Sequence, residues 1–160
     1  MTFTVLLVED EKPLLRNLSA MFKNMVTGKG KHCLRILMAD SQEIAEALLN
    51  DYHYYIDLAV LDIILDIDNP QLKGGLEIAE KIKKSEYYSK PSIIFLSCLE
   101  DPGTVIDAFG LGAKEYVTKE KEDDEILVEA MVKPVKDIEK LKTAISRVCG
   151  AIEFKYVIEN

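Results

Sequence analysis

Several residue types are scarce in this sequence, and each shortage narrows the kinds of protein it can encode. Tryptophan is absent, and the three cysteines, Cys33, Cys98 and Cys149, have neither the spacing of a zinc site nor that of a CxxC motif. We therefore expect reduced thiols in a cytoplasmic protein. No apolar run approaches the length of a membrane span, and the first residues lack the basic and apolar regions of a signal peptide.

Positive charge is also in short supply. Lysine and arginine together number 20 against 28 acidic residues, which gives a formal net charge of −8. A field of this sign repels nucleic acid and anionic membranes, so we expect no direct nucleic-acid partner and no membrane insertion. The length of 160 residues and the hydrophobic share of 48% are typical of one globular domain. A site for phosphate would have to be assembled locally, around a cation.

Apolar runs rich in β-branched residues alternate along the chain with segments that have apolar residues at helical spacing. This alternation predicts an α/β fold, a doubly wound parallel sheet with helices on both faces. The runs predicted to be strands cover residues 3–8, 33–38, 57–62, 92–97 and 115–118.

The last quarter of the chain is predicted to be mostly helical. Two helical segments are expected, over about 123–132 and 135–148, separated by Pro134, which cannot donate the hydrogen bond of a continuing helix. We expect the domain to span residues 1–149 and residues 150–160 to form a tail. Apolar residues alternate in this tail, which predicts an extra edge strand, a dimer arm, or a segment packed on the edge of the sheet.

Polar residues stand where the predicted strands end. Glu9 and Asp10 follow the first strand, Asp62 ends the third, Ser97 ends the fourth and Lys119 follows the fifth. Ligands of open parallel sheets bind beyond the carboxyl ends of the strands, so these side chains are expected to meet. Singly, each has an ordinary explanation as a solvated or helix-capping residue. Together they predict a cluster of carboxylates with one hydroxyl and one ammonium group.

Such a cluster has the groups needed for phosphoryl transfer. Neighbouring carboxylates repel one another unless a cation lies among them, and oxygen ligands suit Mg²⁺ or Mn²⁺. With that charge balanced, Asp62 can remain ionised and act as a nucleophile. Lys119 and Ser97 can stabilise the charge on the transferred group, and the product would be an aspartyl phosphate.

Four stretches, in this order, resemble the receiver domain of response regulators. They are "VLLVEDE" (5–11), "DLAVLDIIL" (57–65), "IIFLSC" (93–98) and "GAKEYVTK" (112–119). The resemblance covers residues 3 to about 149. It implies a flavodoxin-like sheet of five strands in the order 2-1-3-4-5, to which this chain would add a C-terminal helix.

The resemblance also implies a role for each residue of the cluster. Asp62 would be the phosphoacceptor, Ser97 and Tyr116 the switch residues, and Lys119 the partner of the phosphoryl group. The metal would be held by Glu9, Asp10, Asp62 and the backbone carbonyl of Ile64.

A receiver of this kind is a signalling protein that accepts a phosphoryl group from a histidine kinase or a histidine phosphotransfer protein. Slow self-dephosphorylation follows from the same resemblance. The residues after 149 are too few for a DNA-binding or catalytic unit, so we expect the signal to pass through binding of a downstream target protein or of a second copy. A module that binds partners without ever being phosphorylated is the first alternative.

The sequence departs from the family in the residue that follows the lysine. Glu120 follows Lys119, where the family often has proline, whereas the "VKP" stretch at 132–134 contains the familiar pair. Lys133 is therefore an alternative to Lys119. We favour Lys119 because it lies 22 positions after Ser97, a separation that accommodates one helix and one strand.

The loop after Asp62 departs from the family as well. The stretch "DIDNPQLKGG" (66–75) makes this loop several residues longer than usual. Its Asp66 and Asp68 also resemble the Asp-x-Asp motif of haloacid-dehalogenase-type phosphatases, in which they would be nucleophile and acid–base residue. That interpretation leaves Glu9 and Asp10 without a role. We expect Asp66 and Asp68 to be loop residues that tune metal affinity or partner choice.

Overall fold

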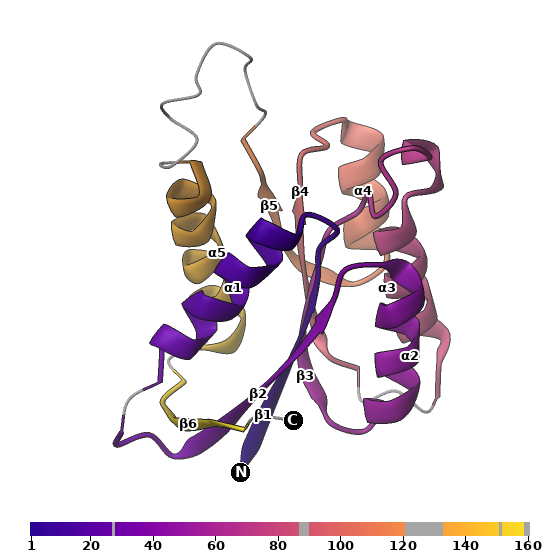
Figure 1. Ribbon diagram of the computed structural model, residues 1–160. Helices are drawn as coiled ribbons and strands as arrows, with labels where there is room; N and C mark the ends of the chain where they lie inside the picture. Colours follow the sequence, from indigo (N-terminus) through magenta and orange to yellow (C-terminus); the bar gives the residue numbers. More distant parts are fainter. Residues whose placement is uncertain (27, 87–89, 121–132, 151, 159–160) are drawn as a thin grey trace.

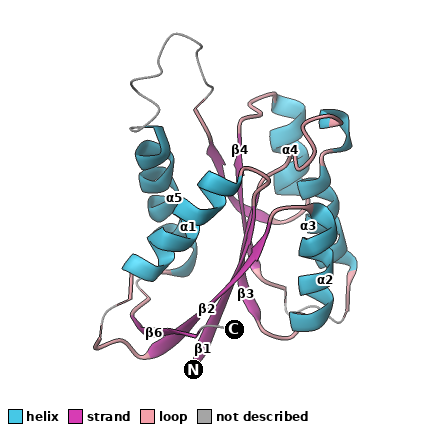
Figure 2. Cartoon of the chain, in the orientation of Figure 1, coloured by secondary structure: helices cyan, strands magenta, loops and turns pink. Residues whose placement is uncertain are grey.

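In the computed structural model the described residues are 1–160 except 27, 87–89, 121–132, 151 and 159–160. They form one parallel sheet with the strand order β5-β4-β3-β1-β2-β6 and helices on both faces (Figures 1 and 2). The strands are β1 (Thr2–Val8), β2 (His32–Ala39), β3 (Ile56–Leu61), β4 (Ser92–Ser97), β5 (Ala113–Thr118) and β6 (Phe154–Ile158). The helices are α1 (Lys12–Asn24), α2 (Gln42–Tyr52), the 3₁₀ turn η1 (Pro70–Leu72), α3 (Gly74–Lys84), α4 (Pro102–Gly110) and α5 (Lys133–Cys149).

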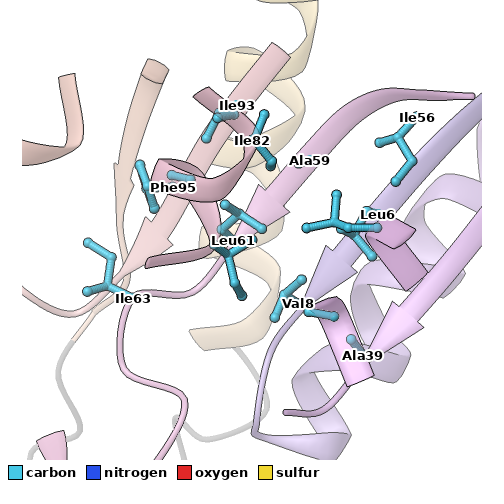
Figure 3. Close-up of a cluster of buried hydrophobic side chains, with 14 of the residues drawn as sticks. Leu6, Val8, Ala39, Ile56, Ala59, Leu61, Ile63, Ile82, Ile93 and Phe95 are labelled. Atoms are coloured by element: carbon cyan, nitrogen blue, oxygen red, sulfur yellow. The ribbon is translucent and has the colours of Figure 1, made fainter. Parts of the chain in front are cut away.

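The sheet separates two layers of apolar side chains. In β1, Leu6 and Val8 belong to the cluster beneath α2, α3 and α4, whereas Val5 and Leu7 face α1 and α5. This division follows from the alternation of side chains along a strand. Figure 3 shows part of the first cluster, in which Leu61 of β3 lies between Leu6 of β1 and Phe95 of β4. Burial on both faces explains why the strands are continuous apolar runs.

The architecture confirms the predicted doubly wound fold, but the sheet has six strands where five were predicted. The additional strand, β6, runs parallel to β2, with His32 paired to Phe154 and Arg35 paired to Ile158. Phe154 is 1% exposed, and its ring centroid lies 5.7 Å from that of Phe3. Burial of this ring and pairing of the open edge of β2 both favour the sixth strand.

The predicted C-terminal helix is present as α5. It begins at Lys133, so Pro134 lies in the first turn, where a missing N–H group leaves no hydrogen bond unmade. Leu141, Ala144 and Ile145 pack it against the face of the sheet that α1 also covers (Figure 1). The helix predicted over 123–132 lies outside the described residues. Among the helices that the structure describes, none is long and apolar enough to cross a membrane.

Candidate phosphoacceptor site

The carboxyl ends of β1 and β3 bring two of the predicted site residues together. The amide of Glu9 donates to the carbonyl of Ala39 at 3.0 Å, and the amide of Asp62 donates to the carbonyl of Val8 at 2.9 Å. The ladder hydrogen bonds thus continue one residue beyond each strand. Glu9 is 1% exposed and Asp62 is 4% exposed, so both carboxyl groups are held in a largely dry position.

Lys119 joins these two acidic residues. Its Nζ atom lies 2.8 Å from Oε2 of Glu9 and 2.9 Å from Oδ2 of Asp62. The amide of Lys119 donates to the carbonyl of Ser97 at 2.8 Å, which aligns the end of β5 with the end of β4. Burial lowers the pKa of Lys119, but the charges of Asp62 and Glu9 outweigh burial and hold this pKa above its ordinary value. Lys119 is therefore a permanent cation in the cluster.

Lys133, the alternative lysine, is the first residue of α5. Its side chain lies outside the part of the chain that the structure describes. The lysine that the structure brings to Asp62 is Lys119.

One ammonium group does not balance the acidic residues of the site. Burial, and then the charge of Asp62, raise the pKa of Glu9 to about 9. Burial also raises the pKa of Asp62, although Lys119 opposes this. Glu9, Asp10 and Asp62 each offer a carboxylate oxygen, and these oxygens lie within 4.8 Å of one another. A bound cation would favour ionisation of all three carboxyl groups, and their oxygen-only ligands suit a hard divalent ion.

Ser97 and Tyr116 both contact the loop between β4 and α4. Ser97 is fully buried, and its Oγ atom accepts a hydrogen bond from the amide of Leu99 at 3.3 Å. The hydroxyl of Tyr116 donates to the carbonyl of Leu99 at 2.6 Å. Burial raises the pKa of Tyr116, so its hydroxyl stays protonated as this donor. The two predicted switch residues thus hold one loop residue, Ser97 through the N–H group of Leu99 and Tyr116 through its carbonyl.

Gly75 is a residue of the site that sequence reasoning missed. Its amide donates to the carbonyl of Ile63 at 2.9 Å, and a Cβ atom at this position would lie 1.9 Å from the carbonyl oxygen of Asp62. Only glycine lets the start of α3 approach the backbone of Asp62 so closely. Ile64 follows in this segment and is half-buried. The glycine pair at 74–75 was the available signal, but the sequence does not say which backbone it approaches.

Asp137 of α5 is a second residue that the sequence did not reveal. It is 6% exposed, and its Oδ1 atom accepts a hydrogen bond from the amide of Glu120 at 3.3 Å. A proline after Lys119 would have no amide hydrogen to donate. Because glutamate and not proline follows Lys119, the chain has an additional amide N–H group at Glu120, and Asp137 accepts its hydrogen bond.

Asp66 and Asp68 lie apart from the cluster. Both are exposed, and Asp66 accepts hydrogen bonds from the amide of Asp68 at 3.0 Å and from the side chain of Asn69 at 2.8 Å. These contacts close a turn at the start of the long loop. In the described part of the chain, the group of acidic residues that could hold a metal is Glu9, Asp10 and Asp62.

Comparisons with known proteins identify the same family that four segments of the sequence were found to resemble. The sequence profile of the response regulator receiver domain matches residues 5–131. The transcriptional regulatory protein CrdR of Helicobacter pylori is 37% identical over 71 residues, which are 44% of this chain and 32% of CrdR. The chain therefore matches about a third of the length of that relative.

Solved structures resemble the chain over most of its length. The Mn²⁺-bound form of response regulator Rcp1 is 24% identical, with a TM-score of 0.63 and coverage of 91% of this chain and 93% of Rcp1. The phosphorylated cyanobacterial phytochrome response regulator RcpA is 18% identical, with a TM-score of 0.68 and the same coverages of 91% and 93%. At these identities the likeness supports the fold. Because the profile covers most of the chain, the protein belongs to the response regulator receiver domain family.

Proposed function

We propose that Asp62 accepts a phosphoryl group from the phosphohistidine of a histidine kinase or of a histidine phosphotransfer protein. The main support is the position of Lys119, whose ammonium group bridges Asp62 and Glu9 at the carboxyl edge of the sheet. A carboxylate held beside a permanent cation, in a site that excludes most water, is prepared to attack phosphorus and to retain the product. We place this reaction in the cytoplasm, where the three free cysteines would stay reduced.

A divalent cation, Mg²⁺ or Mn²⁺, fits the ligands of this site. Glu9, Asp10, Asp62 and the backbone carbonyl of Ile64 would hold it, because they supply the oxygen atoms that such ions prefer. When bound, the cation would neutralise the excess negative charge of the cluster and of the incoming phosphoryl group. The similar protein Rcp1 has a Mn²⁺-bound form.

The residues of the site have different roles in the transfer of the phosphoryl group. A carboxylate oxygen of Asp62 forms a bond to phosphorus while the P–N bond of the donor breaks, and the electron pair of that bond remains on the imidazole. Lys119 keeps its proton and stabilises the negative charge on the phosphoryl oxygens by electrostatic attraction. Slow attack by water on the aspartyl phosphate would later return the protein to its starting state.

Ser97 and Tyr116 would convert phosphorylation into a change of surface. To donate to a phosphoryl oxygen, the Ser97 hydroxyl has to turn toward Asp62 and leave the amide of Leu99, with which it now bonds. Tyr116 would then change rotamer and release the loop at Leu99, which shifts an existing equilibrium of the surface around α4 and β5. A downstream target protein, or a second copy of the chain, would read that surface.

Intact-mass measurement after incubation with acetyl phosphate and Mg²⁺ tests the proposal. The wild-type protein and Asp66→Asn are expected to gain one labile phosphoryl group, whereas Asp62→Asn gains none. Asp66→Asn is the matched control because it neutralises an exposed aspartate a few residues away. Loss of the adduct in Asp66→Asn alone would favour the phosphatase interpretation. If neither acetyl phosphate nor a panel of histidine kinases modifies the wild type, the alternative of a phosphorylation-independent binding module replaces the proposal.

A further inference from the structure

The long loop between β3 and α3 ends in a residue with an unusual backbone. Lys73 has φ 45° and ψ 55°, the left-handed conformation that residues other than glycine seldom adopt. Holding a lysine there costs about 1 kcal/mol or more, so other contacts of this residue have to offset the strain. Its carbonyl accepts the amide of Leu76 at 3.0 Å, which begins α3.

The side chain of Lys73 reaches from the start of α3 to the start of α4. Its Nζ atom donates to Oγ1 of Thr104 at 2.8 Å, and Thr104 is 1% exposed. The Thr104 hydroxyl in turn donates to Oδ2 of Asp101 at 2.8 Å, and the Thr104 amide donates to the same oxygen at 2.9 Å. A positive donor, a hydroxyl and a negative acceptor thus form one chain of hydrogen bonds, an arrangement in which each bond strengthens the next.

Helix α4 buries few apolar side chains against the rest of the protein. Its fully buried side chains are Thr104 and Ala108, whereas Ile106 is 69% exposed and Phe109 is 48% exposed. By contrast, α3 inserts Ile78, Ala79 and Ile82 into the core. Polar contacts from α3 therefore add to the limited apolar packing that holds α4 in place.

A second lysine of α3 contacts the other end of α4. The Nζ atom of Lys83 donates to the carbonyl of Gly110 at 2.8 Å, at the last residue of the helix. Lys83 is exposed and its contact is open to water, whereas Lys73 is half-buried and contacts a buried hydroxyl. The contact at the start of α4 is accordingly the stronger of the two.

The start of α4 is also where the predicted switch acts. The loop held by Ser97 and Tyr116 at Leu99 leads directly to Asp101, which caps the helix. On the other side, α3 is fixed to the phosphoacceptor segment by the bond between Gly75 and Ile63. Lys73 therefore connects α3, which is anchored beside Asp62, to α4, which movement of the loop after Ser97 would displace.

We propose that Lys73 is a positioning residue that restrains the first turn of α4 against α3 in the unphosphorylated protein. The restraint keeps α4 in the arrangement seen in this structure until the loop after Ser97 moves. Its regulatory consequence rests on the proposed function at Asp62, whereas the restraint itself exists without phosphorylation. Lysine at the end of the lengthened loop thus sets how readily α4 changes position.

Hydrogen–deuterium exchange of the α4 amides, measured without phosphate donor, tests the restraint. Lys73→Met is expected to raise the exchange rates of residues 103–110 by about 3- to 10-fold, the range set by losing one hydrogen bond of ordinary net strength. Lys84→Met is the matched control, because Lys84 lies on the same helix and, among the described residues, pairs locally with Glu80. Equal exchange in Lys73→Met and wild type, or an equal increase in Lys84→Met, would overturn the proposal.

A double-mutant cycle separates the specific contact from general loosening. Thr104→Val keeps the shape of the side chain but removes the oxygen that accepts from Lys73. If the contact is the cause, adding Lys73→Met to Thr104→Val raises the α4 exchange rates no further. Additive increases would show that Lys73 acts through something other than Thr104, which rejects the proposal. Unchanged exchange in β1 and β3 verifies that the variants remain folded.

Repeating the exchange with acetyl phosphate and Mg²⁺ separates the restraint from the proposed function. Intact mass reports phosphorylation of Asp62, and we expect Lys73→Met to be phosphorylated to the same extent as wild type. In phosphorylated wild type, the α4 exchange rates should rise toward those of unphosphorylated Lys73→Met. If the wild type is not phosphorylated, the proposed function at Asp62 is rejected. The exchange rates of unphosphorylated wild type and Lys73→Met still show whether Lys73 restrains α4. Phosphorylation without any change in α4 would reject the regulatory consequence.

Discussion

The Nζ atom of Lys119 lies 2.9 Å from Oδ2 of Asp62, although the two residues are 57 positions apart in the chain. The same nitrogen lies 2.8 Å from Oε2 of Glu9. One cation thus balances part of the charge of two carboxyl groups that are almost fully buried. Because burial raises the pKa of both acidic residues, we expect the stability of the folded protein to depend on this lysine.

Removing the cation should destabilise the fold. We expect Lys119→Met to lower the free energy of unfolding by about 3 kcal/mol in the absence of divalent cations, because two buried carboxyl groups lose their partner. Urea denaturation followed by circular dichroism measures the change. The control is Lys12→Met, since Lys12 is exposed and lies 3.6 Å from Asp40, and its loss should change stability by less than about 1 kcal/mol. Equal stabilities of Lys119→Met and wild type would contradict the expected dependence.

Divalent cations should stabilise the wild type through the same cluster. At a free Mg²⁺ concentration about 100 times the dissociation constant, binding to the folded state alone adds about 2.7 kcal/mol to the free energy of unfolding. Thermal unfolding with increasing Mg²⁺ should show this gain in wild type and Asp66→Asn, and lose most of it in Asp10→Asn. A reduced gain in Asp66→Asn would show instead that the long loop tunes metal affinity.

The close approach of α3 to the backbone of Asp62 predicts a strong requirement for glycine. We expect Gly75→Ala to destabilise the protein by more than about 2 kcal/mol, because the added methyl group would collide with the backbone of Asp62. Rotation of a side chain cannot remove this collision, since the atoms that collide with the methyl group belong to the backbone. Gly110→Ala is the control, since nothing lies within 4 Å of a Cβ atom there. Urea denaturation of the two variants makes the comparison. A tolerated alanine at position 75 would mean that α3 can shift away from Asp62 freely.

The sixth strand should contribute to stability through one side chain. Phe154→Ala removes a ring that is 1% exposed and should lower the free energy of unfolding by about 3 to 5 kcal/mol. Tyr156→Ala, on the same strand, removes a ring that is 51% exposed and should cost less than about 1 kcal/mol. Similar losses for both variants, measured by thermal or urea denaturation, would show that β6 acts through its backbone pairing instead.

The alternation of apolar runs and helical stripes was sufficient to predict the parallel sheet and its helices. These patterns are local, because a strand buried on both faces has to be apolar throughout and a helix that covers it has to be apolar on one side. The positions of Asp62, Ser97 and Lys119 at strand ends could be read in the same way. Their convergence then follows from a general property of parallel sheets.

Pairing of β6 with β2 depended on tertiary structure. The alternating residues after Cys149 fit a strand, an arm or a packed tail equally well, since a short alternating pattern does not say which edge it will meet. The structure decides in favour of β2, because that edge is open and Phe154 is buried there beside Phe3. The number of strands was therefore beyond what the local pattern could determine.

By itself, the sequence determined which groups stand at the carboxyl edge of the sheet, because strand ends and residue types are properties of the chain. Only the tertiary structure decided which lysine meets Asp62, which glycine has to lie against its carbonyl, and how Lys73 reaches Thr104. These relationships join residues that are distant in the chain. They depend on distances of a few ångströms between packed elements, and no spacing along the sequence encodes such distances directly.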